Sequence, residues 1–208
     1  MTCGITNLIP KVFAPSWKFK KLKQIPRNTG GLKKRAAKIR GKRLDKELKN
    51  NVTKNICPET KNVRILLDSM ELDIEATQVL AQRKDLKTFL DMIVIHRETH
   101  KKFIVELKRG CKYRRCATSD GKLLHQTSNL TDCLLYQHQL QTLIGRWLAG
   151  HEYDYGVLLI YVNEEEIEMF QECDFVAELS ELGKQSLLQY ACKKQKRKKI
   201  SKKQNQIL

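Results

Sequence analysis

Residues 91–108 read DMIVIHRETHKKFIVELK. Two runs rich in β-branched and aromatic residues flank the polar turn Arg97–His100, a pattern that predicts a β-hairpin. In such a hairpin, residues whose numbers sum to about 197 to 199 face each other, so Asp91 is expected opposite the stretch from Glu106 to Lys108. Because side chains alternate along a strand, Glu106 and Lys108 share one face with Asp91. The sequence therefore predicts two carboxylates and one amine at one end of an apolar surface.

These three charged groups have two interpretations. A carboxylate within an apolar strand loses hydration, and either pairing or a metal ion reduces the cost. Two neighbouring carboxylates suit a hard divalent cation such as Mg²⁺, which takes oxygen ligands and keeps water for chemistry. The alternative is a structural salt bridge of Lys108 with Asp91 or Glu106, because cross-strand ion pairs are common. The spacing alone is compatible with both.

Asp91 followed after a gap by Glu106-Leu107-Lys108 resembles the PD-(D/E)XK nuclease signature. Further segments between about residues 32 and 165 resemble the same family in their order. They are a helix over Gly31–Asn51 that carries Glu47 as an inward-facing acid, a helix that carries Gln139, and the apolar segment Tyr155–Val162, expected as a strand. The resemblance implies an α/β fold with a restriction-endonuclease-like core, in which helices flank a mixed central sheet in the order αβββαβ.

The resemblance also implies a set of catalytic residues: Asp91, Glu106, Lys108, Glu47 and Gln139. Asp91, Glu106 and the Leu107 carbonyl would hold Mg²⁺ or Mn²⁺, and Glu47 would complete a second metal shell. Lys108 would orient or help to deprotonate the attacking water, and Gln139 would position a water or a ligand carboxylate. From the residues alone, Gln139 can equally be a surface side chain among Gln137 and Gln141.

Basic residues surround this expected site, and those expected to bind nucleic acid are Arg109, Lys112, Tyr113, Arg114, Arg115 and Arg146. Arginine can grip phosphate with two hydrogen bonds, and tyrosine can stack on a base. Arg146 lies seven residues, about two turns, after Gln139, so both can point the same way. The alternative for residues 109–115 is an exposed cationic loop without a ligand.

The net charge of +17 is concentrated at the two ends of the chain. Residues 1–60 carry +13, residues 61–190 carry −4 and residues 191–208 carry +8. We therefore expect a flexible basic arm over residues 1–30, a nuclease-like domain over 31–190 and a disordered basic tail over 191–208. Such arms concentrate their field where polyanions bind. The runs Lys193–Lys199 and Lys33–Arg43 also fit nuclear import signals.

The remaining segments are less sharply patterned. The expectations are a first strand over Val63–Leu67, a strand pair near Val79, an irregular stretch over Thr118–Asn129, a helix capped by Thr131 or Asp132 and ended by Gly150, and a C-terminal helix beginning in the acidic run Glu164–Glu168. No apolar run approaches the ~20 residues of a membrane helix. Seven scattered cysteines fit a reducing compartment. We therefore expect an intracellular protein without a membrane partner.

The combination of Glu-Leu-Lys, a basic cysteine-containing loop and a Gln-rich helix also resembles the nuclear proteins of herpesviruses that share this fold. The function expected from these features is a metal-dependent nuclease that hydrolyses phosphodiesters in nucleic acid, DNA before RNA, in the nucleus, which would be the host nucleus for a viral protein. Its expected partners are nucleic acid and the nuclear import machinery. One rival is an inactive nuclease-fold protein that binds nucleic acid or a nuclear partner through its basic arms. A second rival is an interaction module whose charged trio is only an ion-pair network.

Overall fold

The computed structural model describes residues 3–4, 9–13, 31–50, 52, 54–109, 117–124, 131–151, 154–176 and 178–204. Its helices are α1 (Ile9–Phe13), α2 (Gly31–Lys49), α3 (Pro58–Ser69), α4 (Leu134–Ala149) and α5 (Glu181–Gln204), with one 3₁₀ turn, η2 (Glu172–Asp174). Its strands are β1 (Cys3–Gly4), β2 (Leu72–Arg83), β3 (Leu86–His96), β4 (Lys102–Arg109), β5 (Ala117–Lys122), β6 (Thr131–Cys133), β7 (Gly156–Val162) and β8 (Ile167–Gln171). The expectation of a mixed α/β fold is confirmed.

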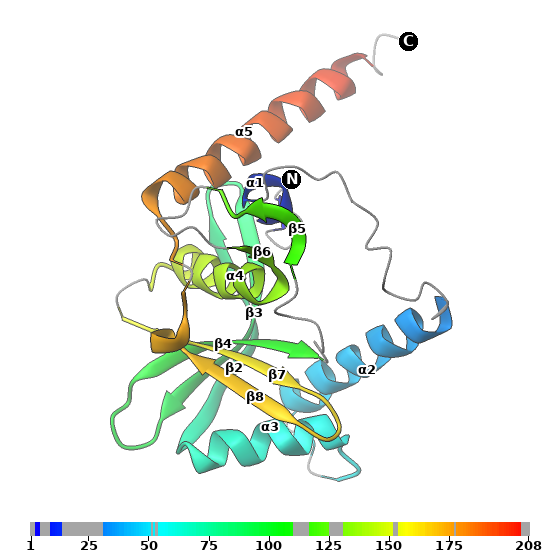
Figure 1. Cartoon of the computed structure of the whole chain (residues 1–208), viewed down its shortest axis with the longest axis vertical. Coiled ribbons are helices and arrows are strands. Elements are labelled where there is room, and N and C mark those ends of the chain that lie inside the picture. The colour runs from blue at the N-terminus through cyan, green and yellow to red at the C-terminus, as the bar shows by residue number, and fades with distance from the viewer. Residues whose placement is uncertain are drawn as a thin grey trace.

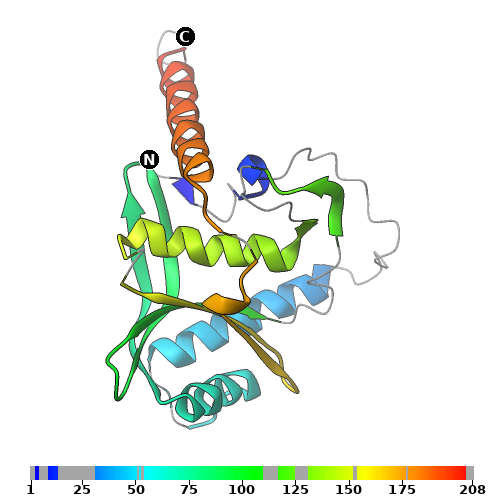
Figure 2. The same cartoon turned by 60° about the vertical axis from the view of Figure 1, so that its left-hand side comes forward.

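Among the described residues, six strands form one mixed sheet. The strands follow each other in the order β2, β3, β4, β7, β8, and β1 pairs with β3 beyond the end of its pairing with β4. Strand β4 runs antiparallel to β3 and parallel to β7, whereas β7 and β8 are antiparallel. Strands β2 and β3 extend past the rest of the sheet and reach β1 (Figure 2). Strands β5 and β6 form a separate pair.

Helices cover both faces of the sheet (Figure 1). On one face α2 and α3 contribute Leu44, Leu48, Val63 and Leu67 to an apolar layer. On the other face α4 packs with α1 and α5. The buried side chains of this second layer include Phe13, Leu90, Ile144, Trp147 and Leu187. Strand β7 is buried along its whole length because it lies between the two layers. The central strands therefore have little solvent contact except where the layers leave an opening.

The predicted hairpin is present. Strand β3 ends at His96, β4 begins at Lys102, and Met92 pairs with Val105, so the paired residue numbers sum to the expected 197. Ile93 and Ile104 lie on the α4 side of the sheet, while Met92 and Val105 lie on the side of α2 and α3. The alternation deduced from the sequence therefore fixed both the register and the face of this hairpin.

The first strand was placed wrongly. Residues 63–67 belong to helix α3, which begins with Pro58 in its first turn and buries Val63 and Leu67, one helical turn apart. Proline is well suited to the first turn of a helix because it lacks an N–H that would need a partner there. The strand of this region is β2, which starts at Leu72. Four strands of the main sheet, β1 to β4, precede α4, and the strand that follows α3 is β2 and not the predicted segment.

Three other local predictions need correction. The acidic run after Asn163 forms a turn, in which the Asn163 side chain accepts hydrogen bonds from the backbone of Glu165 (2.8 Å) and Glu166 (2.6 Å), and the chain continues into β8 instead of a helix. Residues 117–122 form β5 and not irregular chain. Thr131 and Asp132 lie in β6, so the N-cap of α4 is Cys133. Gly150 ends α4 with φ = 79°, as its left-handed preference predicts.

Parts of both expected arms are ordered. Within residues 1–30, Cys3–Gly4 pairs with β3, and α1 buries Phe13 completely, so these segments belong to the domain and not to a flexible arm. At the other end, α5 runs to Gln204 and projects from the body (Figures 1 and 2), where a disordered tail over 191–208 was expected. Lysine, arginine and glutamine are good helix formers, so a helix anchored by Leu187 and Ala191 continues readily into the basic run.

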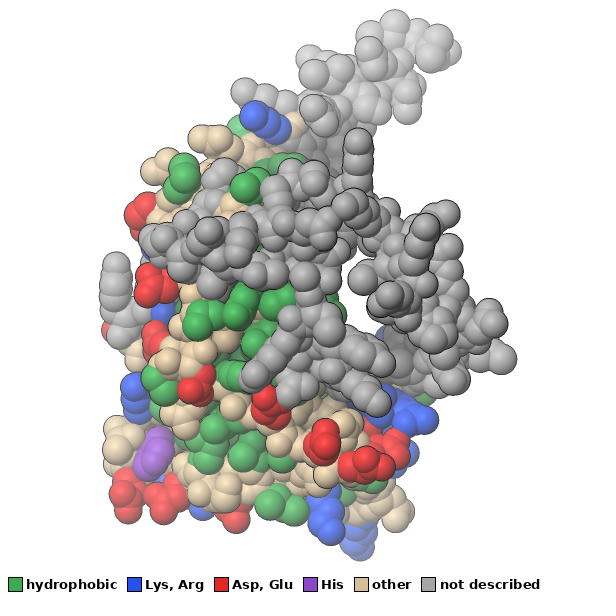
Figure 3. All heavy atoms as spheres, in the orientation of Figure 1, with side chains coloured by type: hydrophobic (Ala, Val, Ile, Leu, Met, Phe, Trp, Pro, Cys, Tyr) green, Lys and Arg blue, Asp and Glu red, His purple; other side chains and the backbone are tan. Residues whose placement is uncertain are grey.

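The described surface mixes acidic and basic side chains, with an apolar area near the middle of the face seen in Figure 3. This mixture agrees with the small net charge of residues 61–190. No helix in the described part of the chain is both long enough and apolar enough to cross a bilayer.

Candidate functional site

Strands β3 and β4 separate at one point and leave an opening in the sheet. Their pairing stops at Met92 and Val105, after which β4 continues beside β7 as far as Arg109, while the first half of β3 pairs with β2 and β1. A cleft of about 480 Å³ lies at this fork. It is bordered by β3, β4, α2 and α4, and Figure 1 shows the end of β4 beside α2.

Asp91 lies at the point where the strands part. Its Oδ2 accepts the Leu107 backbone N–H at 2.8 Å, a bond that takes the place of the next strand-to-strand hydrogen bond. Its Oδ1 lies 3.5 Å from the side-chain nitrogen of Gln78 on β2. Burial raises the pKa of Asp91 above its usual value, although the Leu107 hydrogen bond and the Lys108 charge oppose the rise. Asp91 therefore holds the fork together with one oxygen, while its other oxygen accepts from Gln78, and the residue lines the cleft.

Glu106, Lys108 and Gln141 form a closed triangle of contacts. Lys108 Nζ pairs with Glu106 Oε1 and donates to Gln141 Oε1 at 3.1 Å, while Gln141 Nε2 donates to the same Glu106 oxygen at 2.6 Å. Glu106 is only 6% exposed. Burial, with repulsion from Asp91, raises the pKa of Glu106 to about 7, against the opposing effect of Lys108. The expected convergence of Asp91, Glu106 and Lys108 on one cleft is thus present in the structure.

A third carboxylate, Asp45, enters the cleft from α2. Burial raises the pKa of Asp45, the charge of Asp91 adds to the rise, and Lys108 opposes it. Asp45 was not among the site residues expected from the sequence. Its position directly after the buried Leu44 was the available signal, because a polar residue next to the core stripe of a helix lies at the boundary of the buried face.

Glu47, the acid expected in the site, lies elsewhere. Its carboxylate accepts the Cys57 N–H at 2.8 Å and the Thr60 hydroxyl at 2.7 Å, and it pairs with Arg43 at 2.5 Å. Burial alone would raise the pKa of Glu47, but these hydrogen bonds together lower it to about 2. Glu47 therefore fastens the start of α3 to α2 and does not line the cleft. The expectation that Glu47 completes a second metal shell is corrected accordingly.

Gln139, which was also expected in the site, lies outside it, and Gln141 occupies the expected position. Its side chain donates to the Asp174 carbonyl at 3.4 Å, away from Glu106, whereas Gln141 makes both site contacts. Two positions apart on a helix correspond to about 200° of rotation, so the two side chains point in nearly opposite directions. Gln137, Gln139 and Gln141 are all buried, which also excludes the surface alternative for Gln139.

The arginines expected to bind nucleic acid already have protein partners. Arg109 borders the cleft, but its Nε donates to the buried Glu59 at 2.8 Å. Arg146 donates to the Tyr155 carbonyl at 3.0 Å and to Glu172 at 2.6 Å, and it does not line the cleft. Both arginines are therefore engaged in contacts that stabilise the fold. Lys112, Tyr113, Arg114 and Arg115 lie outside the described residues.

Three further residues of β3 reach the cleft and were not singled out from the sequence: Lys87, Thr88 and Phe89. Phe89 is 54% exposed although it is aromatic and lies in a strand. Behind the site, His138 shares a 2.9 Å hydrogen bond with the Tyr161 hydroxyl. Burial and the nearby Lys108 charge lower the pKa of His138 to about 3, so its ring is neutral at physiological pH.

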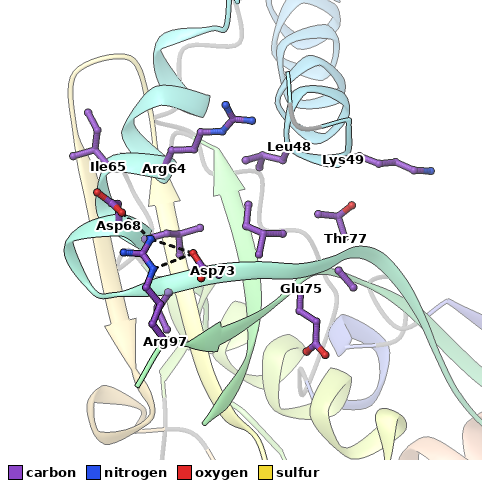
Figure 4. Close-up of a pocket in the computed structure, with 13 residues that line it drawn as sticks. Leu48, Lys49, Arg64, Ile65, Asp68, Asp73, Glu75, Thr77 and Arg97 are labelled. Atoms are coloured by element: carbon purple, nitrogen blue, oxygen red, sulfur yellow. Dashed lines mark hydrogen bonds and ion pairs between the residues drawn. The ribbon is translucent and has the colours of Figure 1, made fainter. Parts of the chain in front are cut away.

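A larger cleft of about 840 Å³ lies between α2, α3 and β2 (Figure 4). Its acids, Asp68, Asp73 and Glu75, are exposed. Asp68 and Asp73 share the guanidinium of Arg97 at 2.8 and 3.1 Å, and Glu75 pairs with Lys102 at 2.5 Å. Figure 4 shows Arg97 between Asp68 and Asp73, so the charges of this group are matched within the protein. The smaller cleft differs because Glu106 is buried, Asp45 and Asp91 are partly buried, and these three acids exceed the two lysines that face them.

That excess makes the cleft chemically suited to a divalent cation. Asp45, Asp91 and Glu106 face Lys87 and Lys108, while Arg109 is neutralised by Glu59, so the ionised site keeps a negative charge. Carboxylate oxygens are the ligands that Mg²⁺ and Mn²⁺ prefer. Within the described residues, no three His, Cys, Asp or Glu side chains are already gathered closely enough to hold a metal. The ligand types and charge fit a cation, and the side chains would have to close around it.

A comparison with models of known protein families finds none that matches this chain, and a comparison with curated protein sequences finds no similar protein.

Proposed function

We propose that this chain is a metal-dependent nuclease of the PD-(D/E)XK type, with a restriction-endonuclease-like core, that hydrolyses phosphodiester bonds in nucleic acid, DNA before RNA. The observation that carries the proposal is the meeting of Asp91, Glu106 and Lys108 at the fork between β3 and β4, in a cleft with surplus negative charge. The order of helices α2 and α3, strands β2, β3 and β4, helix α4 and strand β7, interrupted by the separate β5–β6 pair, supports it.

The residues divide into those that would hold a cation and those that would position the phosphate. Asp45, Asp91 and Glu106 would hold Mg²⁺ or Mn²⁺, together with the Leu107 carbonyl. The cation would neutralise charge on the phosphodiester and make the attacking water more acidic. Lys108, freed from part of its contact with Glu106, would donate to a phosphate oxygen and stabilise the charge that develops there. Gln141 keeps Glu106 and Lys108 in register, because it bonds to both.

The basic ends of the chain would supply most of the affinity for nucleic acid. Residues 191–208 carry +8, and α5 carries much of this run away from the body of the domain (Figure 1). Contacts of lysine and arginine with phosphate release counterions and are independent of sequence. The same run fits recognition by the nuclear import machinery, and the two roles are compatible.

Cleavage assays test the proposal. Single-stranded and double-stranded DNA and RNA are incubated with the protein in Mg²⁺ or Mn²⁺ and in chelator. We expect metal-dependent cleavage that Lys108→Ala and Asp91→Asn each reduce by at least about 100-fold, since removal of one charge-stabilising group typically costs that much. Asp73→Asn is the matched control, because Asp73 is an exposed acid of the same sheet outside this cleft. Cleavage that survives in both site variants would contradict the proposal.

One observation favours the alternative of a protein that binds without cutting. Lys108 is already paired with Glu106, so the site as it stands can be an internal ion pair. This alternative predicts nucleic-acid binding that is indifferent to metal, and no cleavage. Calorimetric titration with Mn²⁺ separates the two: binding that Asp91→Asn abolishes favours the nuclease, and no binding to the wild type favours the alternative. If the wild type also binds no nucleic acid, the charged trio is an ion-pair network in an interaction module.

A further inference from the structure

Phe89 is an aromatic side chain that the fold leaves in solvent beside the proposed site. It is 54% exposed, whereas its neighbour Leu90 is 2% exposed and packs against α4. Its cross-strand partner on β2, Leu80, is also 51% exposed. Exposure of a Phe ring forgoes part of the hydrophobic free energy that burial would provide. A ring left exposed at the border of a cleft is therefore a candidate binding surface.

The position of the ring relative to the charges indicates what it could bind. Lys87, Phe89 and Asp91 occupy alternate positions on β3 and all line the cleft. At ~3.4 Å per residue, they follow one another at intervals of about 7 Å. An amine, an aromatic face and the acid at the fork therefore lie in a row. This series is complementary to a nucleotide, in which a planar base is linked to a phosphate.

The size of the opening favours an unpaired nucleotide over a duplex. A volume of about 480 Å³ lies near the small end of ligand clefts and suits one nucleotide. The bases of a duplex are stacked on each other, and a side chain reaches the face of one only after it is unstacked, at a cost of a few kcal/mol. Unpaired bases offer their faces without that cost and stack on aromatic side chains in single-strand-binding proteins.

We propose that Phe89 is a stacking platform for an unpaired base next to the phosphate held at the fork, so that the preferred substrate is a single strand or the unpaired end of a duplex. This inference rests on the proposed function for the identity of the cleft. Lys87, two residues away, contacts the phosphate on the other side of the stacked base.

The test measures stacking without cleavage. A single-stranded oligonucleotide that contains 2-aminopurine, and the matching duplex, are titrated with protein in chelator, at a salt concentration that suppresses binding to the basic ends. Stacking quenches 2-aminopurine fluorescence. For Phe89→Ala we expect the quenching to be lost and single-strand affinity to fall by roughly 5- to 150-fold, the effect of about 1–3 kcal/mol per stacked base. Duplex affinity should change less than about twofold.

Two variants control the result. Phe89→Trp keeps an aromatic face and is expected to retain quenching. Ile65→Ala removes a comparably exposed apolar side chain, 57% exposed, at the other cleft, and is expected to behave as wild type. Single-strand binding unchanged in Phe89→Ala, an equal loss for both nucleic acids, or no binding by the wild type would overturn the stacking proposal. Single-strand binding through Phe89 without any metal-dependent cleavage would overturn the nuclease proposal alone.

Discussion

Glu106 and Glu47 show how neighbouring groups decide the role of a buried acid. Both are 6% exposed, yet the pKa of Glu106 rises to about 7 while that of Glu47 falls to about 2. Burial raises the pKa in both cases. Glu47 accepts hydrogen bonds from Cys57, Thr60 and Arg43, which stabilise its charge. Glu106, in contrast, lies near a second carboxylate, that of Asp91. Glu47 is thus a satisfied structural anion, and Glu106 is an acid whose charge an added cation would stabilise.

The pH dependence of stability should report the role of Glu47. Its pKa in the folded state, about 2, lies below its ordinary value of 4.5, so its contribution to stability is complete above pH 4.5 and is lost as the pH falls toward 2. Glu47→Gln should lower the free energy of unfolding by about 2 kcal/mol at pH 7. The difference from wild type should shrink at pH 3. Urea unfolding at both pH values measures this difference in free energy, with the exposed Glu165→Gln as control. A difference that is the same at pH 7 and pH 3 would contradict the assigned role of Glu47.

Gln141 and Gln139 provide a second residue-scale prediction. If Gln141 positions Glu106 and Lys108, Gln141→Ala should lower kcat for metal-dependent cleavage about 10- to 100-fold, the usual effect of losing a group that orients site residues. Gln139→Ala should lower the Tm, because it empties a buried position, and leave kcat within about threefold of wild type. Steady-state kinetics and thermal unfolding of both variants test the assignment. The reverse pattern would return Gln139 to the site.

At the scale of elements, the site depends on where two paired strands part. Strand β3 pairs with β4 over residues 92–95 only, and then diverges toward β1. The Asp91 carboxylate accepts the Leu107 N–H at this point, so the backbone of β4 keeps a partner although β3 has turned away. Helix α4 crosses the sheet above the fork and supplies Gln141 (Figure 2). Close packing of α4 on β3 therefore sets the height of that side chain above the cleft.

Gly145 permits this close packing. A Cβ at Gly145 would lie 2.8 Å from Cδ2 of Leu90, which is buried, so Gly145→Ala must displace Leu90 or the helix. We expect a loss of about 1–3 kcal/mol in the free energy of unfolding, the range for overpacked cores. Gly41→Ala on α2 is the matched control, because a Cβ there meets nothing within 4 Å, and it should raise stability by about 0.5–1 kcal/mol. Urea unfolding of both variants decides; equal effects would contradict the packing account.

At the scale of the whole molecule, charge and chemistry are separated. Residues 61–190, which hold Asp91, Glu106 and Lys108, have a net charge of −4, whereas residues 1–60, which include the cleft helix α2, carry +13. The cationic charge lies before and after residues 61–190 in the sequence. Binding and cleavage should therefore be separable by mutation.

Deletion of residues 193–208 should weaken binding to DNA and flatten its salt dependence. The deleted segment carries all eight lysines and arginines of the region beyond residue 190, while Leu187 and Ala191 remain to anchor α5. Each lost phosphate contact should lower the slope of log K against log salt by about 0.7–0.9. The KM for cleavage should rise with little change in kcat. Fluorescence anisotropy over a salt series measures the slope, and an unchanged slope would show that the tail does not touch the phosphates.

The hairpin, and hence the meeting of Asp91, Glu106 and Lys108, follows from the local sequence pattern. Alternation has a period of two, so the register of a short hairpin places each side chain on a definite face. The sequence also indicated the end of α4 at Gly150 and the buried strand that follows. By contrast, residues 63–67 fitted both a strand and a helix, because a short apolar run has no decisive period.

Long-range packing determines which helical side chains complete the site. Asp45 instead of Glu47, and Gln141 instead of Gln139, follow from the rotation of α2 and α4 about their axes. Side chains two positions apart on a helix differ by about 200°, so the rotation of the helix decides which of the two faces a cleft. That rotation is set by packing contacts such as Gly145 against Leu90, which join residues far apart in the chain. The sequence pattern within either helix does not reveal these packing contacts.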